Sequence, residues 1–277
     1  MTFGWVVWGA PRVFAADDCC KSNQGFVEAT VKLADGVSIG VAPQTWLEGL
    51  VSVTMTSENM TRSCSLPHTF NIRVTADKLG RPIELVRARQ LDRGSRYQWQ
   101  HHLYFRIGNS GGRHESNYVY SLPYRKGEKH RIAQGYNGKL SHNAANNCVY
   151  AIDFDMPEGT TVCAAREGTV IAYKNDSNVG GADKRFEDCG NYVAIKHSDG
   201  SYAIYNHLRY NGVLVRLGQS VSKGMSLGLS GSTGWASGPH LHFAVFVPVD
   251  GLHSETYPTK FATEQGILSE LQEGFSY

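Results

Sequence analysis

The chain has 277 residues, a formal net charge of +2 and 41% hydrophobic residues. This length suits two domains better than one small domain, and the apolar fraction is large enough for a buried core. The small net charge gives no electrostatic support for a nucleic-acid partner. No apolar run approaches the roughly 18 residues that cross a bilayer. We therefore expect a folded monomer with no transmembrane segment and no nucleic-acid partner.

The first 16 residues have some features of an export signal. Residues 1–14 are mostly apolar, and Val13 and Ala15 occupy the small-residue positions of a signal-peptidase site. The stretch has no basic start, and Pro11 and Arg12 interrupt it. A buried first strand is the alternative. We expect an exported chain, in the periplasm or in the extracellular cell wall.

The six cysteines are typical of an exported chain with disulfides. None of them forms a C-x-x-C pair, so a zinc ribbon or a thioredoxin-like motif is not indicated. Cys19 and Cys20 are adjacent, too close to pair with each other. A disulfide among Cys148, Cys163 and Cys189 would clamp the second half of the chain, and buried free thiols are the alternative.

Residues 17–124 read as a separate β-rich domain. Residues 51–56 and 70–75 alternate apolar and polar side chains, as a half-buried strand does. Turn signals at residues 78–82 and 92–94 interrupt this pattern. No cluster of chemically active residues stands out in this region. We interpret it as an accessory domain.

Residues 125–260 read as a second all-β domain with an antiparallel sheet. Short strands are predicted at residues 169–173, 192–196, 202–205 and 241–246, with glycines between them. Residues 174–190 form a long polar loop, which in a compact domain is usually functional or mobile. In the remaining tail, residues 261–277, only residues 264–273 have helical character.

The sharpest local signal is the pair His240 and His242. Side chains two apart on a strand point to the same side, about 7 Å apart along the chain. Leu241 then points to the opposite side, into a core. One histidine of such a pair can bind a metal while the other reaches a water on it, although His-x-His alone is a weak signal.

Two further clusters supply candidate partners. Asp153 lies between Ile152 and Phe154, and a carboxylate among apolar neighbours needs a partner because a buried unpaired charge is costly. The partner of Asp153 could be a metal ion or the hydrogen-bond donors of a turn. Asp155 is the competing candidate for the carboxylate ligand. His142 precedes this stretch, and His207 lies at the end of a predicted strand, where a partly buried structural histidine is the alternative.

The clusters occur together in a specific order. Residues 153–160, 165–170, 205–208 and 231–243 read DFDMPEGT, AREGTV, YNHL and GSTGWASGPHLHF. This ordered combination resembles the lysostaphin/LytM-type zinc metallopeptidases of bacterial cell walls, over residues 135–249. The resemblance implies a zinc endopeptidase that cleaves peptides of peptidoglycan.

The resemblance also implies roles for individual residues. His142, Asp153 and His242 would bind one Zn²⁺, with His240 as the general base and His207 as support for the tetrahedral intermediate, two roles that could be exchanged. The family usually places its first histidine four residues before the aspartate. Val149 occupies that position here, and His142 lies 11 residues before Asp153 (153 − 142). A loop over residues 143–149 would have to bring His142 back to the metal.

Two readings of function follow. The first is an active endopeptidase whose accessory domain positions the substrate or covers the groove. The second is an inactive relative that binds the cell wall or regulates other hydrolases. Because every expected residue type is present apart from the displaced histidine, we favour the enzyme. The identity of the scissile peptide bond stays open.

Overall fold

The computed structural model describes residues 25–61 and 64–277. The predicted export signal at residues 1–16 lies outside these ranges, as do Cys19 and Cys20. The described chain is almost entirely β structure, with three short 3₁₀ helices, η1 (Ala76–Lys78), η2 (Ala144–Asn146) and η3 (Lys184–Cys189). The all-β prediction is confirmed. No helix in the described ranges is both long and apolar enough to cross a bilayer.

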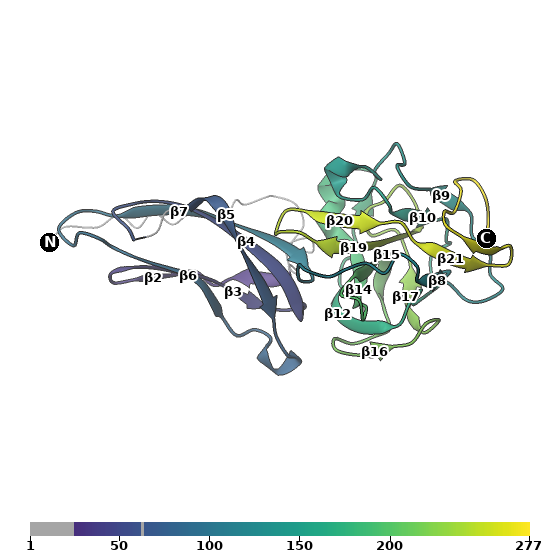
Figure 1. Cartoon of the computed structure of the whole chain (residues 1–277), viewed down its shortest axis with the longest axis horizontal. Helices are drawn as coiled ribbons and strands as arrows, with labels where there is room; N and C mark the ends of the chain where they lie inside the picture. Colours follow the sequence, from purple (N-terminus) through teal and green to yellow (C-terminus); the bar gives the residue numbers. More distant parts are fainter. Residues whose placement is uncertain (1–24, 62–63) are drawn as a thin grey trace.

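The N-terminal region forms two small antiparallel sheets, at the left in Figure 1. Strand β3 lies between β1 and β2 and also pairs with β6, while β4 lies between β5 and β7. The alternating segments predicted at residues 51–56 and 70–75 fall in β4 and β5. The strands are β1 (Phe26–Glu28), β2 (Val31–Leu33), β3 (Gly36–Pro43), β4 (Glu48–Glu58), β5 (Cys64–Arg73), β6 (Ile83–Arg89) and β7 (Gln98–Ile107).

A large antiparallel sheet dominates the rest of the chain, in the order β16-β12-β14-β15-β19-β10-β9, with β11, β17 and β20 attached to it. The four strands predicted from the sequence correspond to β12, β14, β15 and β19. Beside it, β13 and β18 form a two-stranded sheet, and β22, β21 and β8 form a three-stranded sheet. The strands of this part of the chain are β8 (Val119–Ser121), β9 (Ile132–Gln134), β10 (Ile152–Phe154), β11 (Thr161–Cys163), β12 (Gly168–Lys174), β13 (Gly180–Gly181), β14 (Asn191–Lys196), β15 (Tyr202–Val213), β16 (Ser220–Val221), β17 (Ser226–Ser230), β18 (Gly234–Trp235), β19 (Leu241–Pro248), β20 (Ser254–Tyr257), β21 (Lys260–Thr263) and β22 (Gly266–Leu268).

The helix predicted in the tail is wrong. Residues 264–273 contain β22 and turns, and β22 pairs with β21, which runs parallel to β8. Gly266, the first residue of β22 after the tight turn from β21, has φ +106°, a conformation that interrupts a helix and suits glycine. Leu271 is buried in the main core. Tertiary pairing therefore overrides the helical propensity of this segment.

The long polar loop at residues 174–190 is partly ordered into secondary structure. It contains β13, which pairs in parallel with β18, and the helix η3. Asp183 caps η3 by accepting a hydrogen bond from the Arg185 amide. The loop therefore forms a fixed rim beside the central sheet.

The two faces of the large sheet are covered differently. One face packs on a core that includes Ile152, Phe154, Tyr205, Leu241 and Phe243. The other face shares a second core with the N-terminal sheets, to which the large sheet contributes Ile171, Ala172, Ala194, Tyr202 and Phe246. The N-terminal region thus packs directly on the large sheet at one end, and the other end of this face carries His242.

The cysteines of the second half do not pair with one another. Cys148 and Cys163 are free thiols, and Cys189 is in a disulfide, whose other half is neither of these two. A disulfide clamp among the three is therefore wrong.

Candidate metal centre and active site

Neighbouring strands place the predicted site residues side by side. Strand β10 pairs with β19 so that Asp153 lies opposite His242, and β15 pairs with β19 so that Asn206 lies opposite His242 on the other side. Leu241 is fully buried in the main core, as the alternation predicted. The sheet therefore aims Asp153 and His242 at the same point.

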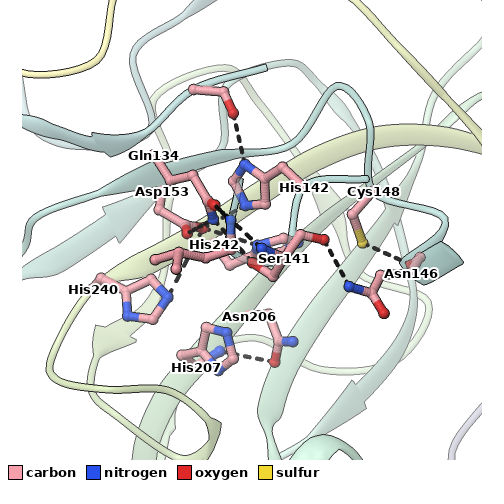
Figure 2. Close-up of polar contacts among 12 residues, drawn as sticks. Gln134, Ser141, His142, Asn146, Cys148, Asp153, Asn206, His207, His240 and His242 are labelled. Atoms are coloured by element: carbon pink, nitrogen blue, oxygen red, sulfur yellow. Dashed lines mark hydrogen bonds and ion pairs between the residues drawn. The ribbon is translucent and has the colours of Figure 1, made fainter. Parts of the chain in front are cut away.

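The loop before β10 brings His142 back to this point. The loop contains η2, whose first turn is capped by the Asn143 side chain, and Asn146 Nδ2 donates to Ser141 O at 2.9 Å. His142 is completely buried. Figure 2 shows its ring next to the Asp153 carboxylate and the His242 ring. One ligand atom from each of these three residues lies within 4.8 Å of the others.

The contacts of the three residues converge on one carboxylate oxygen. Asp153 Oδ1 is 2.9 Å from His242 Nδ1 and 3.1 Å from His142 Nε2. His142 Nδ1 donates its hydrogen to Gly135 O at 2.9 Å, so Nε2 of the neutral ring carries a lone pair. This buried Nε2 makes no hydrogen bond among the described residues despite its closeness to Oδ1. Such a buried pair needs a positive charge, which is either a proton on His142, whose pKa burial would lower but the contact with Asp153 raises, or a metal ion that all three residues bind. The donor types suit a metal ion.

The donor types fit a divalent transition-metal ion. Two imidazoles and one carboxylate with a position left open are typical of catalytic zinc sites. Burial alone would raise the pKa of Asp153, but the contacts with His142 and His242 outweigh burial and hold its pKa well below the ordinary value. Burial lowers the pKa of His242, which favours the neutral imidazole that a metal requires.

His240 and His207 lie beside this cluster with free ring nitrogens. His240 Nδ1 donates to Gly238 O at 2.9 Å, and His207 Nδ1 donates to Thr233 O at 2.7 Å. The Nε2 atom of each neutral ring therefore carries the lone pair. The two rings are 4.5 Å apart between centroids, and His240 Nε2 is 3.9 Å from Asp153 Oδ1. Burial, together with His240 and His242, lowers the pKa of His207 to about 3.

A β-bulge turns His207 toward the site. The prediction that the strand ends near His207 is wrong, because β15 continues to Val213. On β14, Tyr192 pairs with Asn206 and the adjacent Asn191 pairs with Leu208, so that His207 is the extra residue. Its φ of +63° is uncommon outside glycine. Such a bulge re-aims a side chain, which explains why two consecutive residues, Asn206 and His207, both lie near His242.

The competing carboxylate does not join the cluster. Asp155 lies beyond the end of β10 and pairs with Arg131 at 2.5 Å, with both side chains about half exposed. The structure thus brings together all five residues singled out from the sequence, namely His142, Asp153, His207, His240 and His242, and leaves Asp155 outside.

Two further residues, Gln134 and Thr233, were not predicted from the sequence. Gln134 Nε2 donates to Asp153 Oδ2 at 3.1 Å and to Ser141 Oγ at 2.9 Å, while its Oε1 accepts from the amides of Leu140 and Ser141. It therefore ties Asp153 to the loop that carries His142. Thr233 acts through its backbone carbonyl, which any residue has, so its side chain carries no signal for this role.

Comparisons with known proteins agree with this site. Residues 148–254 match the family model described as Peptidase family M23, a range that includes Asp153, His207, His240 and His242 and begins after His142. The chain is 33% identical over 158 residues to the peptidoglycan DD-endopeptidase ShyB of Vibrio cholerae, covering 55% of this chain and 33% of that protein. It is 34% identical over 126 residues to ShyA of the same organism, covering 45% and 26%.

A solved structure of the lysostaphin catalytic domain from Staphylococcus simulans is also similar, with 26% identity and a TM-score of 0.32 over 47% of this chain and 87% of that one. The chain spans about a third or less of the length of the two Vibrio relatives.

Proposed function

We propose, from the match of residues 148–254 to the model of peptidase family M23, that the protein is a zinc-dependent endopeptidase that hydrolyses peptide bonds of bacterial peptidoglycan. The observation that carries the proposal is the convergence of His142 Nε2 and His242 Nδ1 on Asp153 Oδ1. The relatives named as peptidoglycan DD-endopeptidases support this substrate class. An exported location, in the periplasm or extracellular cell wall, follows from that substrate and is part of the proposal.

His142, Asp153 and His242 would hold the ion. Zinc at such a site supplies a water nucleophile at neutral pH and polarises the carbonyl of the scissile bond. Gln134 orients Asp153 through its hydrogen bond to Oδ2, and Gly135 O fixes the His142 ring. Such outer contacts keep ligands in one orientation.

His240 would act as the general base. Its Nδ1–H is held by Gly238 O, so Nε2 faces the ligand cluster as a proton acceptor. A positioned base contributes about 10²–10⁴-fold to a rate. Burial and the neighbouring histidines favour the neutral form of His207 by lowering its pKa. Its ring lies beside His240, and it would support the negative charge of the tetrahedral intermediate by sharing the proton that His240 takes up.

Paired substitutions test the proposal. We expect the zinc-loaded wild type to cleave cross-linked peptidoglycan peptides, and chelation to abolish this cleavage reversibly. His242→Ala should lose both zinc and hydrolysis, whereas His240→Ala should keep zinc and lose about 10²–10⁴-fold in kcat. His68→Ala, an exposed histidine on β5, is the matched control. Near-wild-type turnover in zinc-loaded His240→Ala would contradict the role of the base, and a zinc-loaded wild type without turnover would favour a binding or regulatory module.

A further inference from the structure

A groove runs from the candidate active site toward the N-terminal region. Its volume is about 520 Å³, and it is lined by His242 and by residues of both the large sheet and the N-terminal sheets. The family match begins at residue 148, so the N-terminal residues that line the groove lie outside the matched domain.

The floor of the groove is one row of side chains across the large sheet. Strand pairing places His242 opposite Asn206, Asn206 opposite Tyr192 and Tyr192 opposite Lys174. Three strand spacings give a row about 14 Å long. The next row begins with Ala244 and Ile204, which also line the groove. Lys174, at the far end of the row, is buried, so an extended peptide that crosses the strands can follow this floor from His242 as far as Tyr192.

The wall of the groove comes from the N-terminal region. It consists of Trp46 and residues 103–107 of β7. Among the described strands β7 pairs only with β4, so its other edge is not covered by a strand. The Trp46 indole donates to the Tyr192 hydroxyl at 2.6 Å, which joins the wall to the floor.

Phe105 is a fixed apolar element of this wall. Its ring stacks on Phe26 with centroids 5.8 Å apart, and it packs against the second core, as do its neighbours Leu103 and Ile107. A ring held in this way presents a preformed apolar surface, whose contact with an alkyl side chain removes apolar area from water. A glycine residue has no side chain to bury there.

We infer that Phe105 determines substrate specificity, by providing an apolar surface for an alkyl side chain of a cross-linked stem peptide that lies in this groove. The occupant is a stem peptide of the substrate class that the relatives named as peptidoglycan DD-endopeptidases act on, and the apolar wall and the row that starts at His242 line one groove. The N-terminal region thereby becomes part of the substrate site. This inference rests on the proposed function and assigns the substrate class of the same groove.

The register of β4 offers a matched control for the test. Val51 pairs with Phe105 on one side and with Phe70 on the other. Both phenylalanines are partly buried against the second core, but only Phe105 lines the groove. Phe105→Ala and Phe70→Ala therefore remove the same atoms from equivalent positions of one sheet, and thermal melting shows whether the two variants lose similar stability.

The experiment measures binding of two peptides of equal length to the zinc-loaded full chain, one with the D-alanyl–diamino-acid linkage and one of glycine only, together with KM and kcat for any peptide that is cleaved. We expect the wild type to prefer the first peptide about tenfold, Phe105→Ala to lose most of this preference through Kd and KM, and Phe70→Ala to keep it. Phe105→Leu should be intermediate, and it replaces the alanine variant if that variant fails to fold.

Two results would overturn the inference: equal binding of both peptides by the wild type, or an unchanged preference in the Phe105 variants. Selective binding without hydrolysis would overturn the proposed activity and uphold the inference, so the two can fail separately.

Discussion

At the scale of single residues, the site depends on which ring nitrogen carries the hydrogen. Backbone carbonyls of Gly135, Thr233 and Gly238 each accept a hydrogen bond from the Nδ1 of one histidine. These bonds leave the Nε2 lone pairs of His142, His207 and His240 available. His242 differs, since its Nδ1 faces Asp153. Local sequence cannot indicate this choice of nitrogen, because it depends on carbonyls that the fold brings close.

Gln134 is the residue through which we expect metal affinity to be tuned. Gln134→Ala removes the hydrogen bond to Asp153 Oδ2 and the two bonds that its Oε1 accepts from the amides of Leu140 and Ser141. Outer contacts of this kind typically change metal affinity 10–100-fold, so zinc should bind about that much more weakly in a chelator competition. Gln98→Ala, at an exposed position of β7, is the control and should leave zinc affinity unchanged. Equal zinc affinity in wild type and Gln134→Ala would contradict this role.

At the scale of elements, the strands of the catalytic half were predictable and the irregular segments were not. Strong apolar runs such as residues 192–196 and 241–246 fall within β14 and β19, because burial on both faces of a central sheet leaves a clear pattern. The helix predicted in the tail was wrong because pairing with β8 and the turn at Gly266 decide the structure of this segment. Propensity is a weak guide where such tertiary pairing operates.

The five candidate site residues were predictable for a different reason. A resemblance over several motifs indicated them together, including the displaced His142, although its loop is longer than usual. The bulge at His207 and the contribution of β9 through Gln134 were not predictable. Both arise from strand register, which pairs residues far apart in the chain.

At the scale of the whole molecule, the N-terminal region is fixed to the large sheet by polar contacts as well as by the shared core. Glu48 is buried and accepts hydrogen bonds from Lys196 Nζ and the Tyr202 hydroxyl, each at 2.8 Å. The connecting segment is held by Asp199, whose backbone and side-chain oxygens accept from the amides of Arg113 and Glu115. A groove wall carried by the N-terminal region is thereby kept at one distance from its floor.

The segment around Asp199 also makes stability depend on pH. Burial lowers the pKa of the nearby His197 to about 4 from an ordinary 6.5. The unfolded chain therefore takes up a proton between pH 6.5 and 4 that the folded chain does not, so the free energy of unfolding falls as the pH falls through this window. The loss from His197 alone should be about 2 kcal/mol between pH 7 and pH 5.

Urea unfolding of the metal-free chain at these two pH values measures that loss. His197→Gln should reduce the difference between pH 7 and pH 5, because its side chain does not titrate and its amide can still donate to Glu167 O, as His197 Nδ1 does. His68→Gln, at an exposed position, should behave as the wild type. A difference that is the same in the wild type and in His197→Gln would contradict this account.

The zinc content of the purified wild type and of His142→Ala tests the central claim most directly, since His142 lies before the matched domain and reaches the site only through its loop. We predict one zinc per wild-type chain, lost together with peptidoglycan cleavage in His142→Ala and retained in His68→Ala. Undiminished zinc and cleavage in His142→Ala, or a wild type that binds no zinc, would contradict it.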